Sequence, residues 1–249
     1  MPKLADFLAA ALAGVAALAS AADVPVAVAS NFTEPMQRIA REFEKDTGHR
    51  AMLAFGATGN FYAQIRNGAP FMLLLAADEQ TPARLEKEGY AVAGARFTYA
   101  TGRLVLWSAQ PGLVDDKGAV LAKGGFDHIA LANPALAPYG AAAVETLTRL
   151  DLLERVRPRF VQGENIGQAF QFVATGNAPL GFVALSQVMV NGRIEKGSAW
   201  VVPAGLHAPI RQDAVVLAPG KDSAAAAALA AYLRSDKARA IIRSYGYEF

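Results

Sequence analysis

The chain has 249 residues, a formal net charge of +2 and no cysteine, and 53% of its residues are hydrophobic. This length allows one or two domains with sizeable cores, and the lack of cysteine excludes disulfides, thiolate metal sites and a lipid-anchored cysteine. The chain has no basic run and no basic stripe with interleaved aromatic residues, so we expect no nucleic-acid partner.

Residues 1–21 are predicted to form a secretory signal peptide. Lys3 precedes an apolar run over residues 7–18, and the small residues at 19–21 are typical of a cleavage site. The apolar run is shorter than the stretch of about 20 residues that a membrane-spanning helix needs. Because Asp6 offsets Lys3, a non-cleaved anchor is the alternative. Cleavage would release the protein into a bacterial periplasm.

The first predicted strand, residues 24–29, leads into a helix through Ser30, Asn31 and Thr33, with Pro35 in the first helical turn. The first N–H groups of a helix have no internal partner and carry partial positive charge, so such a junction suits an anion. The Ser, Asn and Thr side chains add further donors. We therefore interpret the chain as a secreted binding protein for a small oxyanion.

The following segments repeat this arrangement. Apolar residues at helical spacing over 36–43 predict a helix that ends at Gly48, and residues 50–55 read as a strand. Thr58 opens a second helix, residues 71–77 form an apolar run of buried-strand length, and another helix begins near residue 81. This alternation predicts a parallel sheet with helices on both faces and ligands at the carboxyl ends of its strands.

A second domain follows. We expect a longer strand over residues 97–108 to cross into it and a strand over residues 210–217 to return. Between them we expect strands at 129–132 and 180–184, and helices after residues 137–140 and after residues 163–165. Ser223 and Ser235 are predicted caps of two C-terminal helices. The resulting domains are residues 22–104 with 208–249, and residues 105–207.

Catalytic motifs are lacking. The three histidines are scattered without ligand spacing, Ser186 lacks the Gly-x-Ser-x-Gly elbow, and residues 56–59 lack the lysine of a phosphate-binding loop. Asp78 and Glu79 follow an apolar strand and are compatible with a catalytic pair. We favour helix capping for them, because no matching acid, base or metal cluster occurs elsewhere.

Some candidate residues have two interpretations. Tyr139, after Pro138 at a predicted helix start, is either a core aromatic residue or a residue that turns its hydroxyl to a ligand. Asn31 and Thr58 are either plain helix caps or ligand donors. The residues alone leave both questions open.

Short motifs over nearly the whole chain carry a family resemblance. They are ASNFT (29–33), FGATG (55–59), QIRNGAP (64–70), AAD (76–78), ANP (132–134), APYG (137–140), GENI (163–166), TGNA (175–178), LGFVALSQ (180–187) and YGY (245–247). In this order and spacing, they resemble the periplasmic molybdate-binding proteins of ABC importers.

The resemblance implies a two-lobed α/β fold of the periplasmic binding-protein type. Each lobe is expected to be a mostly parallel sheet flanked by helices, with two crossover strands as the hinge. Molybdate or tungstate would bind between the lobes through neutral donors and pass to a membrane ABC permease. We expect a periplasmic monomer with no cofactor and no enzymatic activity.

By position, the resemblance also implies a set of ligand residues. Asn31 matches a ligand-binding Ser or Asn, and Thr58 matches a Ser, with Ser30 beside the site. Tyr139 matches a position where some members use a Tyr hydroxyl and others a backbone N–H. Ile166 matches a helix-start residue that donates its backbone N–H.

Ala184 matches a position where some members have a ligand-binding Tyr, whose loss Tyr139 would compensate. In addition, Phe71 and Met72 replace the family's usual Ala-Asp after Pro70, and Thr58 adds a methyl group beside the site. A site of neutral donors favours a fully ionised dianion. Sulfate or another oxyanion, a secreted enzyme, and a sensor or interaction protein of the same fold are the alternatives.

Overall fold

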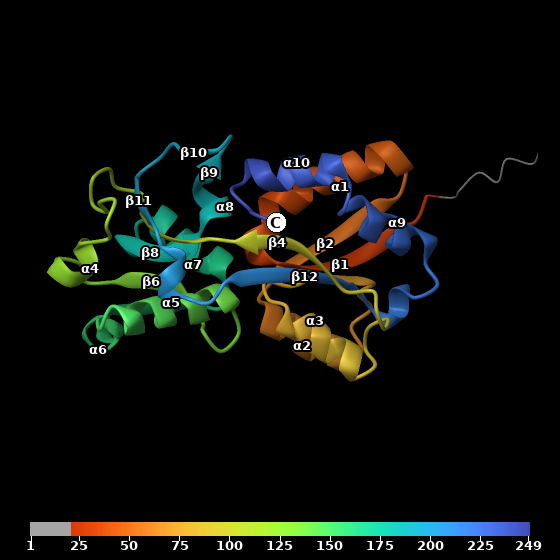
Figure 1. Ribbon diagram of the computed structural model, residues 1–249, viewed down its shortest axis with the longest axis horizontal. Helices are drawn as coiled ribbons and strands as arrows, with labels where there is room; N and C mark the ends of the chain where they lie inside the picture. The colour runs from red at the N-terminus through yellow and green to blue at the C-terminus, as the bar shows by residue number, and fades with distance from the viewer. Residues whose placement is uncertain (1–20) are drawn as a thin grey trace, which may run out of the picture.

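The computed structural model describes residues 21–249, which form two lobes lying side by side along the long axis (Figure 1). The predicted signal peptide, up to residue 20, lies outside the described residues. In residues 21–249, no helix is long and apolar enough to span a membrane.

The first lobe is built on a five-stranded sheet in the order β2-β1-β3-β12-β4. Its strands are β1 (Asp23–Ala29), β2 (Arg50–Gly56), β3 (Leu73–Leu75), β4 (Phe97–Gly102) and β12 (Ile210–Val216). β1 pairs in parallel with β2 and β3, and β12 alone runs antiparallel to its neighbours β3 and β4. This sheet is therefore mostly parallel, as expected.

The second lobe repeats this plan in the order β11-β5-β8-β6-β7. Its strands are β5 (Leu104–Ser108), β6 (Ile129–Ala132), β7 (Phe160–Gly163), β8 (Leu180–Ala184) and β11 (Ser198–Val201). Here β5 is the reversed strand, antiparallel to β8 and β11. A small hairpin of β9 (Met189–Val190) and β10 (Arg193–Ile194) lies beside this sheet.

Helices cover both faces of each sheet (Figure 1). In the first lobe, side chains of β1 alternate between two cores: Val26 and Val28 pack with α1, α9 and α10, while Ala27 packs with α2 and α3. The helices of this lobe are α1 (Thr33–Thr47), α2 (Thr58–Arg66), α3 (Gln80–Lys87), α9 (Ala224–Tyr232) and α10 (Asp236–Ser244). In the second lobe they are α4 (Val120–Lys123), α5 (Pro138–Arg149), α6 (Leu153–Val156), α7 (Ile166–Ala174) and α8 (Leu185–Val188). Short 3₁₀ turns are η1 (Ser30–Phe32), η2 (Arg157–Arg159), η3 (Ala204–Leu206) and η4 (Ala218–Gly220).

Three predicted helix ends are confirmed. α1 ends at Gly48 in the left-handed conformation, with a φ of 75°. The side chains of Ser223 and Ser235 accept hydrogen bonds from the backbone N–H groups of Ala226 and Ala238, so they cap α9 and α10.

The chain crosses between the lobes twice, and the first crossing differs from the prediction. The expected single strand over 97–108 is two strands, β4 and β5, separated only by Arg103. A Cβ atom at Gly102 would overlap the Tyr139 hydroxyl of the second lobe. Only glycine therefore lets the end of β4 approach that lobe so closely. The second crossing runs from β11 through η3 into β12.

β3 is also shorter than the predicted apolar run of residues 71–77. Phe71 precedes the strand and packs edge-on against Phe61 of α2, with ring centroids 5.5 Å apart. Phe71 and Met72 thus lie at the amino end of β3, whereas Ala76 and Ala77 follow its carboxyl end.

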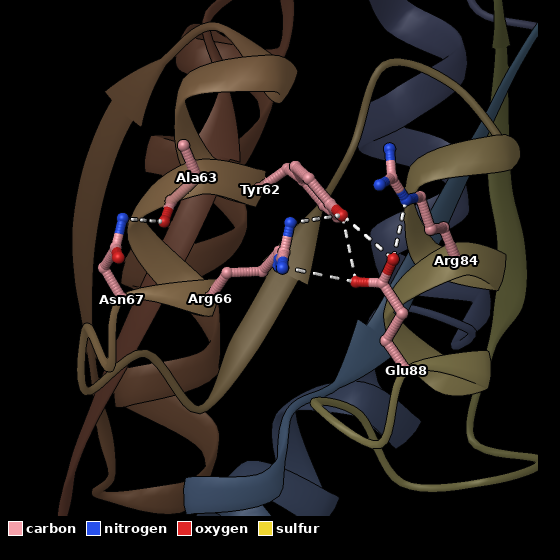
Figure 2. A network of polar contacts seen from close by, with 6 residues as sticks. All are labelled: Tyr62, Ala63, Arg66, Asn67, Arg84 and Glu88. Carbon is pink, nitrogen blue, oxygen red and sulfur yellow. Dashed lines mark hydrogen bonds and ion pairs between the residues drawn. The ribbon is translucent and has the colours of Figure 1, made fainter.

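α2 and α3 are braced on their exposed side by a charged cluster (Figure 2). The Glu88 carboxylate accepts hydrogen bonds from Tyr62 at 2.9 and 3.0 Å and from Arg84 at 2.8 Å, and lies 3.7 Å from Arg66. The Arg84 guanidinium lies 4.4 Å from the centre of the Tyr62 ring. We name these four residues the surface cluster.

Candidate functional site

Four strand-to-helix junctions converge on one small cavity of about 10 Å³ between the lobes. The first lobe contributes the β1–η1 and β2–α2 junctions, and the second lobe contributes the starts of α5 and α7. The lining residues are Ala29, Ser30, Asn31, Gly56, Ala57, Thr58, Ala77, Ala137, Pro138, Tyr139, Asn165 and Ile166. We name this space the interlobe cavity.

Three of these helical segments begin without a side-chain cap. Ala29, Ala57 and Ala137 occupy the N-cap positions of η1, α2 and α5, and alanine has no acceptor to offer. At α7, the Asn165 side chain accepts from the N–H of Gln168, which leaves the N–H of Ile166 at the helix start. First-turn N–H groups therefore remain for a ligand in the interlobe cavity.

Two hydroxyls add donors. Thr58 Oγ1 accepts a hydrogen bond from the N–H of Ala77 at 3.0 Å, and Ser30 Oγ accepts one from the N–H of Gly167 at 3.1 Å. Because each oxygen is already an acceptor, its own hydrogen is left to donate elsewhere. Both side chains are buried, with exposed fractions of 1% for Thr58 and 8% for Ser30.

Behind the cavity lies a buried network of neutral side chains, which we name the hinge network. Gln212 on β12 is its centre: Oε1 accepts from Asn31 Nδ2 at 2.8 Å and from Tyr99 OH at 2.9 Å, and Nε2 donates to Tyr139 OH at 3.0 Å. Tyr247 OH lies 2.9 Å from Asn31 Nδ2 and 3.0 Å from Ser186 Oγ. The network joins side chains of both lobes through a crossing strand.

The tyrosines of this network are neutral donors. Burial raises the pKa of Tyr99 and Tyr139 well above the usual value, and raises the pKa of Tyr247 to about 12. All three therefore keep their protons at physiological pH.

Among residues 21–249, no charged side chain lines the interlobe cavity. The Asp78 carboxylate lines a larger neighbouring cleft of about 350 Å³, and burial raises its pKa. It accepts hydrogen bonds from the N–H of Thr81 at 2.7 Å and from the Thr81 hydroxyl at 3.1 Å. The Asp78 side chain thus bonds the first turn of α3, as the capping interpretation requires, whereas Glu79 occupies the N-cap position and makes no side-chain capping hydrogen bond.

The lobes are in direct contact around the cavity. The N–H of Gly59 donates to the carbonyl of Leu136 at 2.9 Å, and Asn60 Nδ2 donates to Glu164 Oε1 at 2.6 Å. The space between them is close to the smallest that holds one water molecule. This is a closed arrangement of the two lobes.

The structure brings together five of the six predicted site residues: Ser30, Asn31, Thr58, Tyr139 and Ile166 all line the cavity. Ala184 does not line it. It precedes α8, and its N–H donates to Gln187 Oε1 at 2.9 Å, so this junction is already satisfied within the chain.

Two details of the predicted residues differ from the sequence interpretation. The Tyr139 hydroxyl is bonded to Gln212 in the hinge network, while its backbone lies at the uncapped start of α5. Asn31 lies within η1 and Thr58 begins α2, and neither residue is an N-cap, since Ala29 and Ala57 hold those positions. The sequence analysis missed Tyr99 and Gln212 altogether, and the neighbours of Gln212 in β12, Arg211 and Asp213, are polar too, so no local pattern set it apart.

The comparisons agree with this architecture. The family model of the bacterial extracellular solute-binding proteins matches residues 24–248. The chain belongs to this family. It is 60% identical over 233 residues to the molybdate-binding protein ModA of Azotobacter vinelandii, covering 94% of this chain and 92% of that one. It is 53% identical over 234 residues to the molybdate-binding protein ModA of Rhodobacter capsulatus, covering 94% and 91% of the two chains.

A solved structure shares the fold. The periplasmic molybdate-binding protein of Azotobacter vinelandii superposes with a TM-score of 0.88 at 44% identity, covering 91% of this chain and 99% of that one. The predicted two-lobed fold of the periplasmic binding-protein type is thereby confirmed. As a member of a solute-binding family, the chain is a bacterial extracellular binding protein and not an enzyme.

Proposed function

We propose that this protein binds molybdate, and tungstate equally, in the interlobe cavity and delivers it to a membrane ABC permease. The observation that carries the proposal is a cavity ringed by uncapped helix starts from both lobes and lined by no charged side chain. The similarity to two molybdate-binding proteins supports this ligand class.

The proposed ligands are all neutral donors. The hydroxyls of Ser30 and Thr58, the Asn31 side chain and the backbone N–H groups of Tyr139 and Ile166 surround the anion. A fully ionised tetrahedral dianion has only acceptors, which matches such a set. An oxyanion that keeps a proton would need an acceptor in return, and its O–H would be left unpaired. The cavity thus selects by protonation as well as by size.

Lobe movement is part of the proposal. Residues 22–104 with 208–249 and residues 105–207 would move as two units about the crossings at Arg103 and at η3. Because the anion enters from solvent, the lobes have to part and close again over it. The closed monomer would then present one shape to the permease. We further propose that residues 1–21 are removed on export to the periplasm.

Calorimetric titration tests the proposal. The protein lacking residues 1–21, cleared of bound anion, would be titrated with molybdate, tungstate, sulfate and phosphate in turn. We expect tight one-to-one binding of molybdate and tungstate, with sulfate and phosphate at least a hundredfold weaker, as two lost donor contacts would give. Preferential sulfate binding would refute molybdate as the ligand but would support an oxyanion site in this protein. Binding of none of the four would indicate a sensor or interaction protein instead.

A further inference from the structure

One atom at the interlobe cavity has the wrong polarity for an anion. Asn31 is 2% exposed, and both hydrogens of its Nδ2 point away to Gln212 and Tyr247. Its Oδ1 is the one buried side-chain polar atom in residues 21–249 without a hydrogen-bond partner. In this arrangement, Asn31 offers the cavity an acceptor, which repels an oxyanion.

A second mismatch lies on the other side of Gln212. The Tyr99 hydroxyl has one hydrogen but lies near two acceptors, the carbonyl of Ala76 at 3.0 Å and Gln212 Oε1 at 2.9 Å. Only one of them can receive the hydrogen. Both hydrogen-bonding mismatches, at Asn31 Oδ1 and at the Tyr99 hydroxyl, therefore involve partners of Gln212.

Turning both amides by half a rotation pairs Asn31 Oδ1 and the Tyr99 hydroxyl, and it leaves the hydrogens of Asn31 Nδ2 for an acceptor in the cavity. Gln212 Nε2 then donates one hydrogen to Tyr99 OH and the other to Asn31 Oδ1, and Tyr99 donates to Ala76. Gln212 Oε1 accepts from Tyr139 OH. The Tyr247 hydroxyl, which donates to the carbonyl of Asn31 at 2.9 Å, donates to Asn31 Oδ1 instead, and Ser186 keeps its own bond to that carbonyl at 2.7 Å. The two ends of an amide are nearly equal in size, so the turn needs no extra room.

We propose that Gln212 is a positioning residue that aims the Asn31 amide donor at the bound anion. The fully ionised anion selects the turned arrangement, because only then does Asn31 Nδ2 face the cavity. Gln212 is fully buried and is not among the residues that line the cavity. This inference rests on the proposed function, since it assigns a donor to the same site.

The hinge network also ties this donor to lobe closure. Tyr139 belongs to α5 of the second lobe, whereas Asn31, Tyr99 and Gln212 belong to the first. The turned Gln212 keeps the Tyr139 contact only when the lobes are together. Correct orientation of Asn31 and closure are therefore expected to reinforce each other.

Gln212→Met tests the proposal, because Met keeps the approximate size of the side chain and has no amide to orient that of Asn31. Molybdate and phosphate affinities would be measured by calorimetry at pH 7 for the wild type and the variant. We expect a tenfold to hundredfold loss of molybdate affinity, the effect of one misdirected donor on a charged group. Phosphate, which keeps a proton at this pH, should lose much less, so the molybdate preference should narrow about tenfold.

Equal losses for both anions, or unchanged affinities, would overturn the positioning role. Thr98→Val is the matched control: Thr98 lies on β4, hydrogen-bonds to Asp213 at 2.7 Å, and is outside the hinge network. We expect this variant to keep the wild-type preference. Absence of oxyanion binding by the wild type would instead refute the proposed function, so the two failures are distinguishable.

A measurement on the wild type covers the case in which Gln212→Met does not fold. In protein labelled with ¹⁵N at glutamine, the side-chain NH₂ signal of Gln212 would be followed as molybdate is added. We expect this signal to move at one equivalent, because its partners change although Gln212 does not touch the anion. An unmoved Gln212 signal beside shifted signals of the cavity residues would refute the amide turn.

Discussion

Two polar networks of the molecule, the surface cluster and the hinge network, differ in exposure and in charge. The surface cluster is exposed and charged, with two arginines sharing the carboxylate of Glu88 (Figure 2). The hinge network is buried and neutral, with amides and hydroxyls only. Charges in water cost little to keep and contribute little when paired, whereas buried charges are expensive.

The difference indicates how the cavity would discriminate between anions. An arginine there would attract any anion by charge alone, with little regard to its protonation. Neutral donors on fixed helix starts bind only where an acceptor meets each of them. The following variants test whether the neutral network governs binding and the charged cluster does not.

The largest effect is expected for Asn31→Asp. A carboxylate in the interlobe cavity would face a dianion at short range, a repulsion of about several kcal/mol at the effective dielectric of a protein site. We expect molybdate affinity to fall by more than about a thousandfold. Asn31→Ser, which keeps a neutral donor, is the control and should retain most of the binding. Tight binding by Asn31→Asp would refute the placement of Asn31 at the anion.

The features of this site that could be predicted from the sequence are those made by residues close together in the chain. Strand–helix alternation and the family resemblance predicted both lobes. The junctions made Ser30, Asn31 and Thr58 candidates, and the resemblance assigned them to the site and added Tyr139 and Ile166, which also line the cavity. These features are local, because a strand end and the next helix start are neighbours in the chain. The strand break at Arg103 was missed. It lies beside Gly102, which comes against Tyr139 of the other lobe, and no local pattern reports that approach.

Long-range contacts explain the remaining misses. Asn31 and Gln212 are 181 residues apart in the chain, and no local pattern pairs them. Ala184 was included because some family members have a ligand-binding Tyr at this position; in this chain its N–H is bonded to the Gln187 side chain instead. The alanines at positions 29, 57 and 137 were a readable signal, since an uncapped helix start indicates a use for its N–H groups.

The next effect is expected for Thr58→Val, which replaces the hydroxyl with a methyl group of similar size. The anion loses one donor, and the N–H of Ala77 loses its acceptor. We expect molybdate affinity to fall tenfold to a hundredfold, or about 1.5–3 kcal/mol. In Thr58→Ser the affinity should stay near the wild-type value. Calorimetry measures the molybdate affinity of both variants. Equal affinities of Thr58→Val and Thr58→Ser would show that the Thr58 hydroxyl does not bind the anion.

A smaller effect is expected for Tyr139→Phe. The hydroxyl contacts Gln212, so its removal should cost one neutral hydrogen bond, or about 1 kcal/mol, in ligand-free stability and a fewfold loss of affinity. Urea unfolding and calorimetry measure the two quantities. A hundredfold loss of affinity with unchanged stability would instead show that the hydroxyl donates directly to the anion.

The smallest effect is expected for Glu88→Gln in the surface cluster. The hydrogen bond from Arg84 holds the pKa of the Glu88 carboxyl below its usual range. For an acid with a lowered folded-state pKa, the stabilisation is present above the unfolded-state value and is lost as the pH falls through the folded-state value. At low salt, the Tm of Glu88→Gln should therefore lie slightly below that of the wild type at neutral pH, and the two Tm values should converge as the pH falls through the folded-state pKa of Glu88. At high salt we expect no difference in Tm.

The molybdate affinity of Glu88→Gln should stay within about twofold of the wild-type value, because substitutions far from a site with no shared partners have nearly independent effects. The same measurement would detect coupling between the surface cluster and the cavity through α2. α2 carries Tyr62 and Arg66 of the surface cluster, and Thr58 of the cavity lies at its start. A clear loss of affinity would show that the charged brace sets the position of this helix start, and that the two networks are coupled through α2.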